Sequence, residues 1–252
     1  MATIKKIKKT IFRLCLVVAI LVAAGALLLR FYSYGASNTA ELVAQQDANE
    51  ASDVLYFPKS EVGQENLPAI IFYPGAFVAP ASYSIWAHAL ALQGYPVYII
   101  KLPLNLAVLA PKKAAEVIEK YQLTDYVLGG HSLGGVMASR FAHDHADDHL
   151  KGIFFLASYP DEKGRLDEFN LPVLSITGSR DGVLDWDDYA AAQKFLPAQT
   201  NYKMIQGGNH AGFGSYGAQK GDFSADITNS KQQTLIAEAI ITWLSQQKNQ
   251  EH

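Results

Sequence analysis

Cysteine is nearly absent from this chain, because Cys15 is the single cysteine among 252 residues. A chain with one cysteine forms no internal disulfide and is no disulfide-stapled scaffold. An excess of positive charge is also lacking: 21 basic residues stand against 24 acidic ones, and the formal net charge is −3. Nucleic-acid-binding domains are typically basic, so we expect no nucleic-acid partner. Hydrophobic residues make up 49% of the chain, enough for a substantial core.

The first thirty residues differ in kind from the rest. Four lysines and Arg13 precede or begin an uncharged apolar run over residues 14–29. Sixteen helical residues extend about 24 Å, and flanking apolar and aromatic residues bring the segment near the thickness of a bilayer core. We therefore predict a cytoplasmic basic stub and a transmembrane anchor over residues 1–32, with a cleaved signal peptide as the alternative. The positive-inside rule then places the remainder outside the cytoplasm, as a single-pass membrane protein or, after cleavage, a secreted one.

The next segment, residues 33–52, is small, polar and without periodicity. Such composition is typical of a flexible connection, and we predict a linker. We expect a single folded domain over residues 53–252.

A regular alternation begins after residue 53. Continuous β-rich apolar runs alternate with stretches of helical pattern, which predicts an α/β fold with a mostly parallel sheet and helices on both faces. The expected strands are 69–73, 97–101, 126–130, 152–157, 173–177 and 202–205, with 53–57 as a further candidate. The expected helices are 84–93, 114–121, 133–145, 185–196 and 231–247.

Unusual residues gather directly after several expected strands. Parallel sheets bind ligands at the carboxyl ends of their strands. The sequence GHSLGG follows one such strand and precedes a helix, and it centres the pattern G-x-S-x-G on Ser132. A strand, a sharp turn and a helix are what a nucleophile elbow requires. We therefore predict that Ser132 is a catalytic nucleophile.

A serine hydroxyl needs a neighbouring base. In a strand–elbow–helix hydrolase the base follows the serine in the chain, with an acid between them. His210 fits best, because it lies in the glycine-rich stretch GGNHAGFGSYG after the last expected strand. The glycines predict a mobile loop that lets the ring reach Ser132. The other histidines are interpreted as packed, pointing elsewhere, terminal, or part of a solvated helix end rather than a metal cluster: His88, His131, His252, His143, His145 and His149.

The acid is expected after the preceding strand. Asp181 lies there in the turn TGSRDG, where it would hold the tautomer of His210 and stabilise its imidazolium. Asp185, Asp187 and Asp188 begin the next expected helix, where an aspartate ordinarily caps the helix or complements its dipole. We predict Asp181 as the acid.

Together these motifs identify the chain, from Tyr56 onward, as similar to the α/β-hydrolase superfamily. YPGAFVAPASY, KLPLNLAVLAP, GGHSLGG, ASYP, GSRDGV and GGNHAGFGSYG resemble a bacterial dienelactone-hydrolase-like subgroup of serine hydrolases. The resemblance implies a Ser132–Asp181–His210 triad, no metal and no cofactor. It also implies oxyanion donors at the backbone N–H groups of Leu133 and Ala76, with Phe77 as the fallback.

The function that we expect is a carboxylesterase-type serine hydrolase whose partner is a small-molecule ester. Only 13 residues, 158–170, separate two expected strands at the usual place of a cap, so we predict a minimal cap or none and substrates of short to medium acyl length. A membrane-tethered acyltransferase, or a non-catalytic binding protein on a hydrolase scaffold, are the alternatives.

Overall fold

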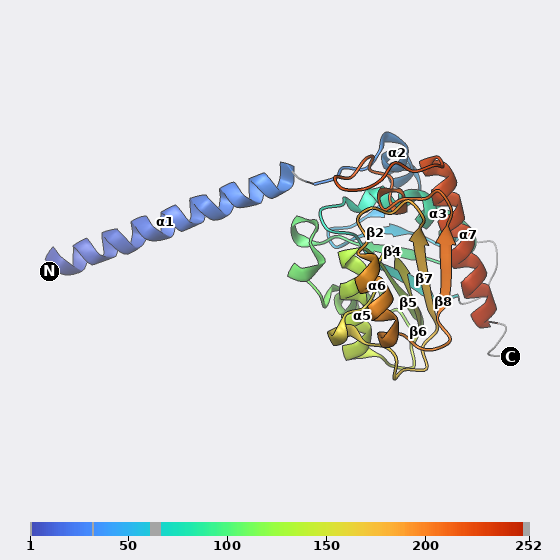
Figure 1. Ribbon diagram of the computed structural model, residues 1–252. Helices are drawn as coiled ribbons and strands as arrows, with labels where there is room; N and C mark the ends of the chain where they lie inside the picture. The colour runs from blue at the N-terminus through green and yellow to red at the C-terminus, as the bar shows by residue number, and fades with distance from the viewer. Residues whose placement is uncertain (1, 32, 61–66, 249–252) are drawn as a thin grey trace. The chain divides into compact units, whose positions relative to one another are not determined.

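The computed structural model describes residues 2–31, 33–60 and 67–248, and within the first helix it describes the side chains of residues 8, 9, 11–20, 22, 23 and 25. His252, which the sequence analysis weighed, lies outside these ranges. The chain divides into two compact units, Met1–Ser33 and Tyr34–His252. Figure 1 shows the elements of each.

The first unit is the helix α1 (Ala2–Phe31). Among the residues that the structure describes, no helix has both the length and the apolar character that a membrane crossing requires. The transmembrane anchor predicted for residues 1–32 is therefore not supported. The uncharged run of sixteen helical residues by itself extends about 24 Å, which is less than a hydrocarbon core of about 30 Å. The location of the second unit outside the cytoplasm stays a prediction.

The second unit is built on an eight-stranded sheet with the order β1-β2-β4-β3-β5-β6-β7-β8. β1 pairs with β2, and β2 with β4, in antiparallel fashion, whereas all pairs from β4 to β8 are parallel. The strand bounds are β1 Asn49–Glu50, β2 Val54–Phe57, β3 Ala69–Tyr73, β4 Val97–Ile100, β5 Tyr126–His131, β6 Leu150–Leu156, β7 Val173–Gly178 and β8 Asn201–Ile205. All six expected strands and the further candidate are confirmed within a few residues at each end.

Helices cover both faces of the sheet, as predicted. Along β3 the side chains alternate: Ile70 and Phe72 pack on one face with α2, α3 and α7, whereas Ile71 and Tyr73 pack on the other with α4 and α5. This alternation follows from the two-residue period of a strand. Figure 1 shows α3 and α7 on one side of the sheet and α5 and α6 on the other. The helix bounds are α2 Asn38–Asp47, α3 Ser84–Leu92, α4 Lys113–Tyr121, α5 Leu133–His145, α6 Trp186–Ala192 and α7 Asn229–Lys248.

The segment 33–52 is not the linker that its composition suggested. It contains α2, which Ser37 caps by accepting the N–H of Ala40, and the strand β1. The segment is joined to a distant part of the chain, because Ser37 N–H donates to the carbonyl of Ser215 at 2.6 Å and the two hydroxyl oxygens lie 2.8 Å apart. The second unit therefore begins at Tyr34 rather than at residue 53. The prediction was wrong because it relied on local polarity. The buried face of α2 consists of two small residues, Ala40 and Ala44, and so gives no strong apolar signal in the sequence.

The connection between β6 and β7 is short. Residues 157–172 contain one turn of 3₁₀ helix, η4 (Glu162–Gly164), as their regular structure. Asp161 caps this turn by accepting the N–H of Gly164, and its carboxylate pairs with the Arg140 guanidinium of α5. The segment is thus held against α5 and adds no helical layer above the carboxyl ends of the strands.

Candidate active site

Ser132 lies in the sharp turn that joins β5 to α5. Its φ of 50° is unusual for a residue other than glycine, and its ψ is −126°. Such strained backbone persists only where the surroundings hold it. Two hydrogen bonds do so: Ser132 N–H donates to the Leu156 carbonyl at 3.0 Å, and the Ser158 hydroxyl donates to the Ser132 carbonyl at 2.6 Å. Leu156 is the last residue of β6 and Ser158 follows two residues later, so the end of the neighbouring strand and the start of the next connection fix the turn.

Glycines allow the close packing around this turn. A Cβ at Gly134 would lie 2.2 Å from the Tyr73 carbonyl oxygen, and a Cβ at Gly130 would lie 2.5 Å from the carbonyl carbon of Gly134. Distances below 3.0 Å to backbone atoms are not tolerated without movement. The first turn of α5 therefore reaches the end of β3 because it carries no side chain there.

Asp181 lies in the turn after β7 and is 2% exposed. Its Oδ1 accepts the N–H groups of Val183 at 2.9 Å and Leu184 at 2.8 Å. Its Oδ2 lies 2.9 Å from Nδ1 of His210. Every oxygen of this buried carboxylate is thus satisfied, which fixes its orientation.

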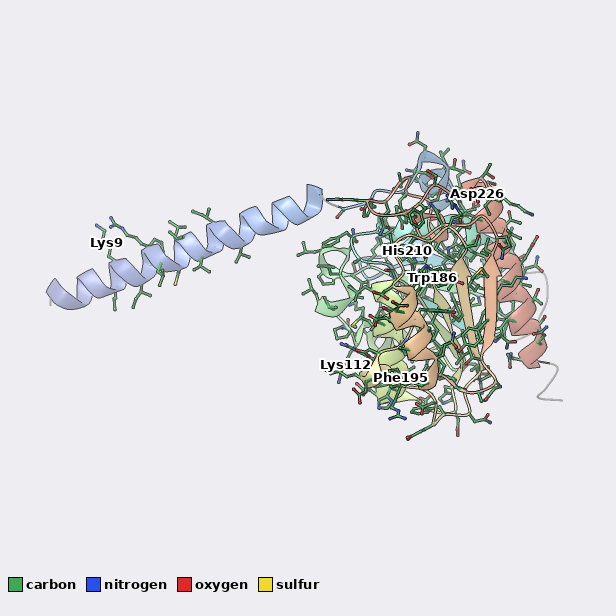
Figure 2. The ribbon with its side chains drawn as sticks, viewed as in Figure 1. Lys9, Lys112, Trp186, Phe195, His210 and Asp226 are labelled. Atoms are coloured by element: carbon green, nitrogen blue, oxygen red, sulfur yellow. The ribbon has the colours of Figure 1, made fainter. Side chains whose placement is uncertain are left out.

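His210 follows β8 and is 1% exposed; it is labelled in Figure 2. Because a carboxylate only accepts hydrogen bonds, the contact with Asp181 places the imidazole proton on Nδ1. The other ring nitrogen, Nε2, then carries the lone pair. It is buried and has no hydrogen-bond partner in the part of the chain that the structure describes.

The other predicted aspartates lie elsewhere. Asp185 caps α6 by accepting the N–H groups of Asp187 at 3.1 Å and Asp188 at 3.0 Å. Asp187 and Asp188 lie exposed in the first turn of the helix. Of these aspartates, Asp181 is the one that the fold brings to His210.

The structure does not join Ser132 to His210 by a hydrogen bond, since Nε2 of His210 is without a partner among the described residues. Both residues follow the carboxyl ends of strands of the same sheet, Ser132 after β5 and His210 after β8, with β6 and β7 between these strands. In enzymes without bound substrate the bond between nucleophile and base is often long or misaligned.

The glycine-rich loop around His210, which the sequence predicted to be mobile, is hydrogen-bonded to side chains of α7. The side chain of Gln232 in α7 makes two hydrogen bonds to the backbone of Asn209. Its Oε1 accepts the Asn209 N–H at 3.1 Å, and its Nε2 donates to the Asn209 carbonyl at 2.8 Å. Gln233 donates to the carbonyls of Gly212 and Gly214 at 2.8 and 3.1 Å. The glycines admit these side chains, because a Cβ at Gly212 would lie 1.9 Å from Oε1 of Gln232.

The sequence suggested that His131 points away from the site, but in the structure its ring lies beside that of His210. Its ring centroid lies 4.7 Å from that of His210. Its Nδ1 lies 3.0 Å from the hydroxyl oxygen of Tyr83, which accepts the N–H of Gly75 at 2.8 Å. Burial, together with the charge of His210, holds the pKa of His131 well below its ordinary value.

The predicted oxyanion donors are distinguished by their partners. Phe77 N–H donates to the Asn105 carbonyl at 2.8 Å, which removes the fallback donor. For Ala76 and Leu133 the described residues offer no backbone hydrogen bond to their N–H groups. Both residues are half-buried and lie where β3 ends and α5 begins.

Two histidines near the end of α5, His143 and His145, each contact a different backbone carbonyl. His143 Nδ1 lies 2.8 Å from the Arg165 carbonyl, and His145 Nδ1 lies 3.1 Å from the Phe141 carbonyl. Within the described ranges no group of three or more metal-ligating side chains is close enough to hold an ion.

Sequence reasoning missed several residues that shape the site. Four such residues contact the backbone of the site, and no local sequence pattern indicates these contacts: Tyr83, Asp222, Gln232 and Gln233.

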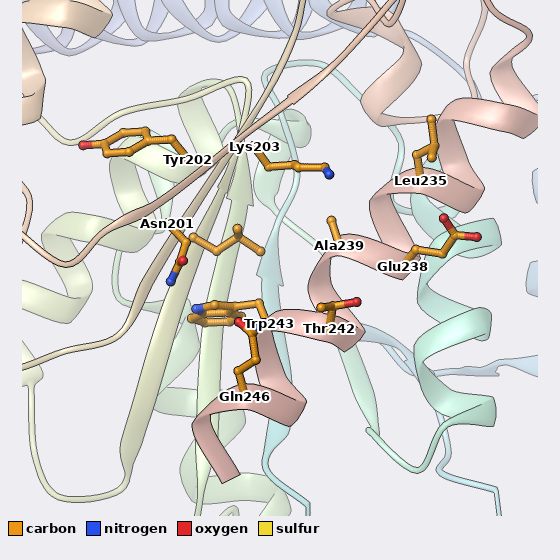
Figure 3. Close-up of a pocket in the computed structure, with 10 residues that line it drawn as sticks. Asn201, Tyr202, Lys203, Leu235, Glu238, Ala239, Thr242, Trp243 and Gln246 are labelled. Carbon is orange, nitrogen blue, oxygen red and sulfur yellow. The ribbon is translucent and has the colours of Figure 1, made fainter. Parts of the chain in front are cut away.

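A pocket of about 310 Å³ between β8 and α7, drawn in Figure 3, lies on the outer flank of the sheet. It touches Asn201, Tyr202 and Lys203 in the first half of β8, whereas His210 follows the other end of that strand.

Comparison with known proteins agrees with this architecture. A family model described as "Alpha/beta hydrolase family" matches residues 69–234, whereas no curated protein matches the chain. A similar solved structure is MGS-MChE2, an alpha/beta hydrolase enzyme from the metagenome of lagoon sediments of Mar Chica, Morocco, at 13% identity and a TM-score of 0.59, covering 81% of this chain and 100% of that one.

Two further structures are similar. Est1E from Butyrivibrio proteoclasticus is 14% identical with a TM-score of 0.56, over 79% of this chain and 98% of that one. An alpha-beta serine hydrolase homologue from Coxiella burnetii is 14% identical with a TM-score of 0.54, over 77% and 94%. At such identities the likeness concerns the fold. Membership of the dienelactone-hydrolase-like subgroup stays a prediction.

Proposed function

The chain belongs to the alpha/beta hydrolase family, and on that premise we propose that it is a serine hydrolase that cleaves carboxylic esters of short to medium acyl length. The observation that carries the proposal is the buried pair of His210 and Asp181, 2.9 Å apart, with Nε2 of His210 unpartnered among the described residues. A buried base with its second nitrogen held by a carboxylate is the arrangement that activates a serine.

The first half of the reaction forms an acyl-enzyme. Ser132 Oγ attacks the carbonyl carbon of the ester while Nε2 of His210 takes the hydroxyl proton. Asp181 stays ionised and stabilises the imidazolium. The N–H groups of Ala76 and Leu133 donate hydrogen bonds to the carbonyl oxygen as negative charge develops on it. The alcohol then leaves with the proton from His210.

The second half returns the enzyme to its starting state. A water molecule gives a proton to His210 Nε2 and attacks the acyl carbon, and the carboxylic acid leaves as Ser132 regains its proton. An acyltransferase would use the same intermediate with an acceptor alcohol in place of water. Product analysis with a deliberately added alcohol distinguishes the two, because transfer yields a new ester and hydrolysis only the free acid.

The test of the proposal is labelling by a fluorophosphonate probe, which requires an activated serine and no knowledge of the substrate. We expect the wild-type protein and Ser139→Ala to be labelled and Ser132→Ala to be unlabelled. Ser139 is the matched control, because it lies on α5 and its hydroxyl donates to the Val136 carbonyl at 2.9 Å. A wild-type protein that resists the probe would favour a binding protein on a hydrolase scaffold.

The short connection between β6 and β7 supports the expected substrate size. With η4 as its regular structure, this connection offers little to enclose a long acyl chain. We expect hydrolysis rates of p-nitrophenyl esters to fall from butyrate to palmitate, with no jump as a substrate passes its solubility limit. A preference for long chains would contradict this part of the proposal.

A further inference from the structure

The carboxylate of Asp222 touches both of the loops that carry the acid and the base. Its Oδ2 accepts the N–H of Ala211 at 2.8 Å, and its Oδ1 accepts the N–H of Gly182 at 3.0 Å. Ala211 is the residue after His210, and Gly182 is the residue after Asp181. One side chain therefore bridges the turns that follow β7 and β8.

These bonds matter because Asp181 and His210 are 29 residues apart and belong to separate strand ends. A hydrogen bond of 2.9 Å between their side chains holds only while the two turns keep their relative position. Hydrogen bonds to an ionised acceptor are roughly twice as strong as those between neutral groups. Asp222 is half-buried, so solvent screens these bonds incompletely.

Asp222 is not itself the partner of the base. Both of its oxygens are directed to backbone N–H groups, and Oδ1 also accepts the N–H of Phe223 at 3.0 Å. The Nδ1 atom of His210 is taken by Asp181. Asp222 acts on the pair only through the backbone on either side of it.

We propose that Asp222 is a positioning residue that locks the Asp181 turn to the His210 loop, an inference that rests on the proposed function. Removal of this bridge lets the two turns shift independently. Misplacement of a catalytic group by about 1 Å costs on the order of 100-fold in rate. The loss falls on kcat rather than on KM, because both oxygens of Asp222 are directed to backbone N–H groups and the residue acts by positioning the pair.

The test compares three variants of the full chain. Asp222→Ala removes all of the bonds. Asp222→Asn keeps one oxygen, which retains the two bonds of Oδ1 to Gly182 and Phe223, and turns its NH₂ group toward the N–H of Ala211. Asp226→Asn is the matched control: it removes the same charge from the same segment, but this side chain is 66% exposed and forms an ion pair with the Arg180 side chain at 3.5 Å. Asp226 is labelled in Figure 2.

Amide hydrogen exchange followed by NMR measures the protection of the Ala211 and Gly182 amides, and so tests the Asp222 bridge independently of activity. We expect the Ala211 amide to exchange at least about tenfold faster in Asp222→Asn while the Gly182 amide keeps its protection, and both to exchange faster in Asp222→Ala. Neither amide changes in Asp226→Asn. Unchanged exchange at Ala211 in both Asp222 variants would overturn the proposal.

Kinetics with p-nitrophenyl butyrate give the second measurement. We expect kcat to fall roughly 10- to 100-fold in Asp222→Asn with KM within about twofold of wild type, and no change in Asp226→Asn. An equal loss of kcat in Asp222→Asn and Asp226→Asn, or a wild-type kcat in Asp222→Asn, would contradict the positioning role. A wild-type protein without esterase activity defeats the proposed function instead, and the exchange measurement then decides the role of Asp222 alone. If Asp222→Ala does not fold, Asp222→Asn carries both measurements.

Discussion

Oδ2 of Asp181 lies 2.9 Å from Nδ1 of His210, and both side chains are almost completely withdrawn from solvent. Burial removes competing water, so the imidazole is held in one tautomer. The carboxylate is itself fixed by two backbone N–H groups, those of Val183 and Leu184. The pair is therefore organised before any substrate binds, which is the condition for effective electrostatic catalysis.

This relationship predicts a large difference in kcat between substitutions of two aspartates that are four positions apart in the chain, Asp181 and Asp185. Asp181→Asn should lower kcat by about 10⁴, because an amide at this position no longer holds the proton on Nδ1 of His210. Asp185→Asn should leave kcat near the wild-type value, since Asn caps α6 about as well as Asp. Steady-state kinetics with a short p-nitrophenyl ester measure both. A crippled Asp185→Asn variant would show that the acid is assigned to the wrong turn.

Tyr83→Phe tests the support of the loop that carries Ala76. The substitution leaves the buried N–H of Gly75 without an acceptor and Nδ1 of His131 without its hydroxyl partner. Each unsatisfied buried group costs about 1–3 kcal/mol, so denaturant unfolding should show a clear loss of stability together with a lower kcat. Tyr126→Phe is the control, because that hydroxyl makes only a 3.4 Å contact with Asp147. Equal stability losses would argue against a special role for Tyr83.

The buried His131 predicts a pH dependence of stability. Its folded-state pKa is lowered by burial and by the charge of His210, whereas the unfolded chain has a value of about 6.5. Below that pH the unfolded state binds a proton that the folded state does not, so this group lowers the free energy of unfolding as pH falls, by up to about 1.4 kcal/mol per pH unit. Above about pH 7.5 the effect vanishes.

Unfolding experiments at intervals from pH 8 to pH 5 measure this slope in the wild-type protein and in His131→Asn. The variant loses the titrating ring and should show a shallower decline. Identical slopes for the two proteins would mean that His131 titrates normally in the folded state.

Gly134→Ala should destabilise the domain, although alanine ordinarily stabilises a helix relative to glycine by about 1 kcal/mol. The added Cβ would lie 2.2 and 2.4 Å from the carbonyl oxygens of Tyr73 and Pro74. Overpacking of this kind typically costs about 1–3 kcal/mol. Gly35→Ala is the matched control, since nothing lies within 4 Å of a Cβ there. Thermal unfolding of the two variants should shift the midpoint of the first alone.

Much of the fold was predictable from the sequence because its signals are local. The apolar runs that became β3 to β8 and the periodic stretches that became α3 to α7 are properties of short segments, since side-chain period follows directly from backbone geometry. The placement of Ser132, Asp181 and His210 after the strands β5, β7 and β8 is equally local. Parallel strands present their carboxyl ends at one edge, so residues distant in the chain were expected near each other.

The tertiary structure decided what depends on partners far along the chain. The polar residues after Ser33 suggested a linker, yet Ser37 is bonded to Ser215, 178 positions away, and α2 packs against the domain. The glycines around His210 suggested mobility, because glycine widens the freedom of an isolated backbone. In the folded chain the same glycines make room for Gln232, and Asp222 ties the loop to the Asp181 turn. Local composition sets which conformations are open to a segment, and contacts from elsewhere in the fold select among them.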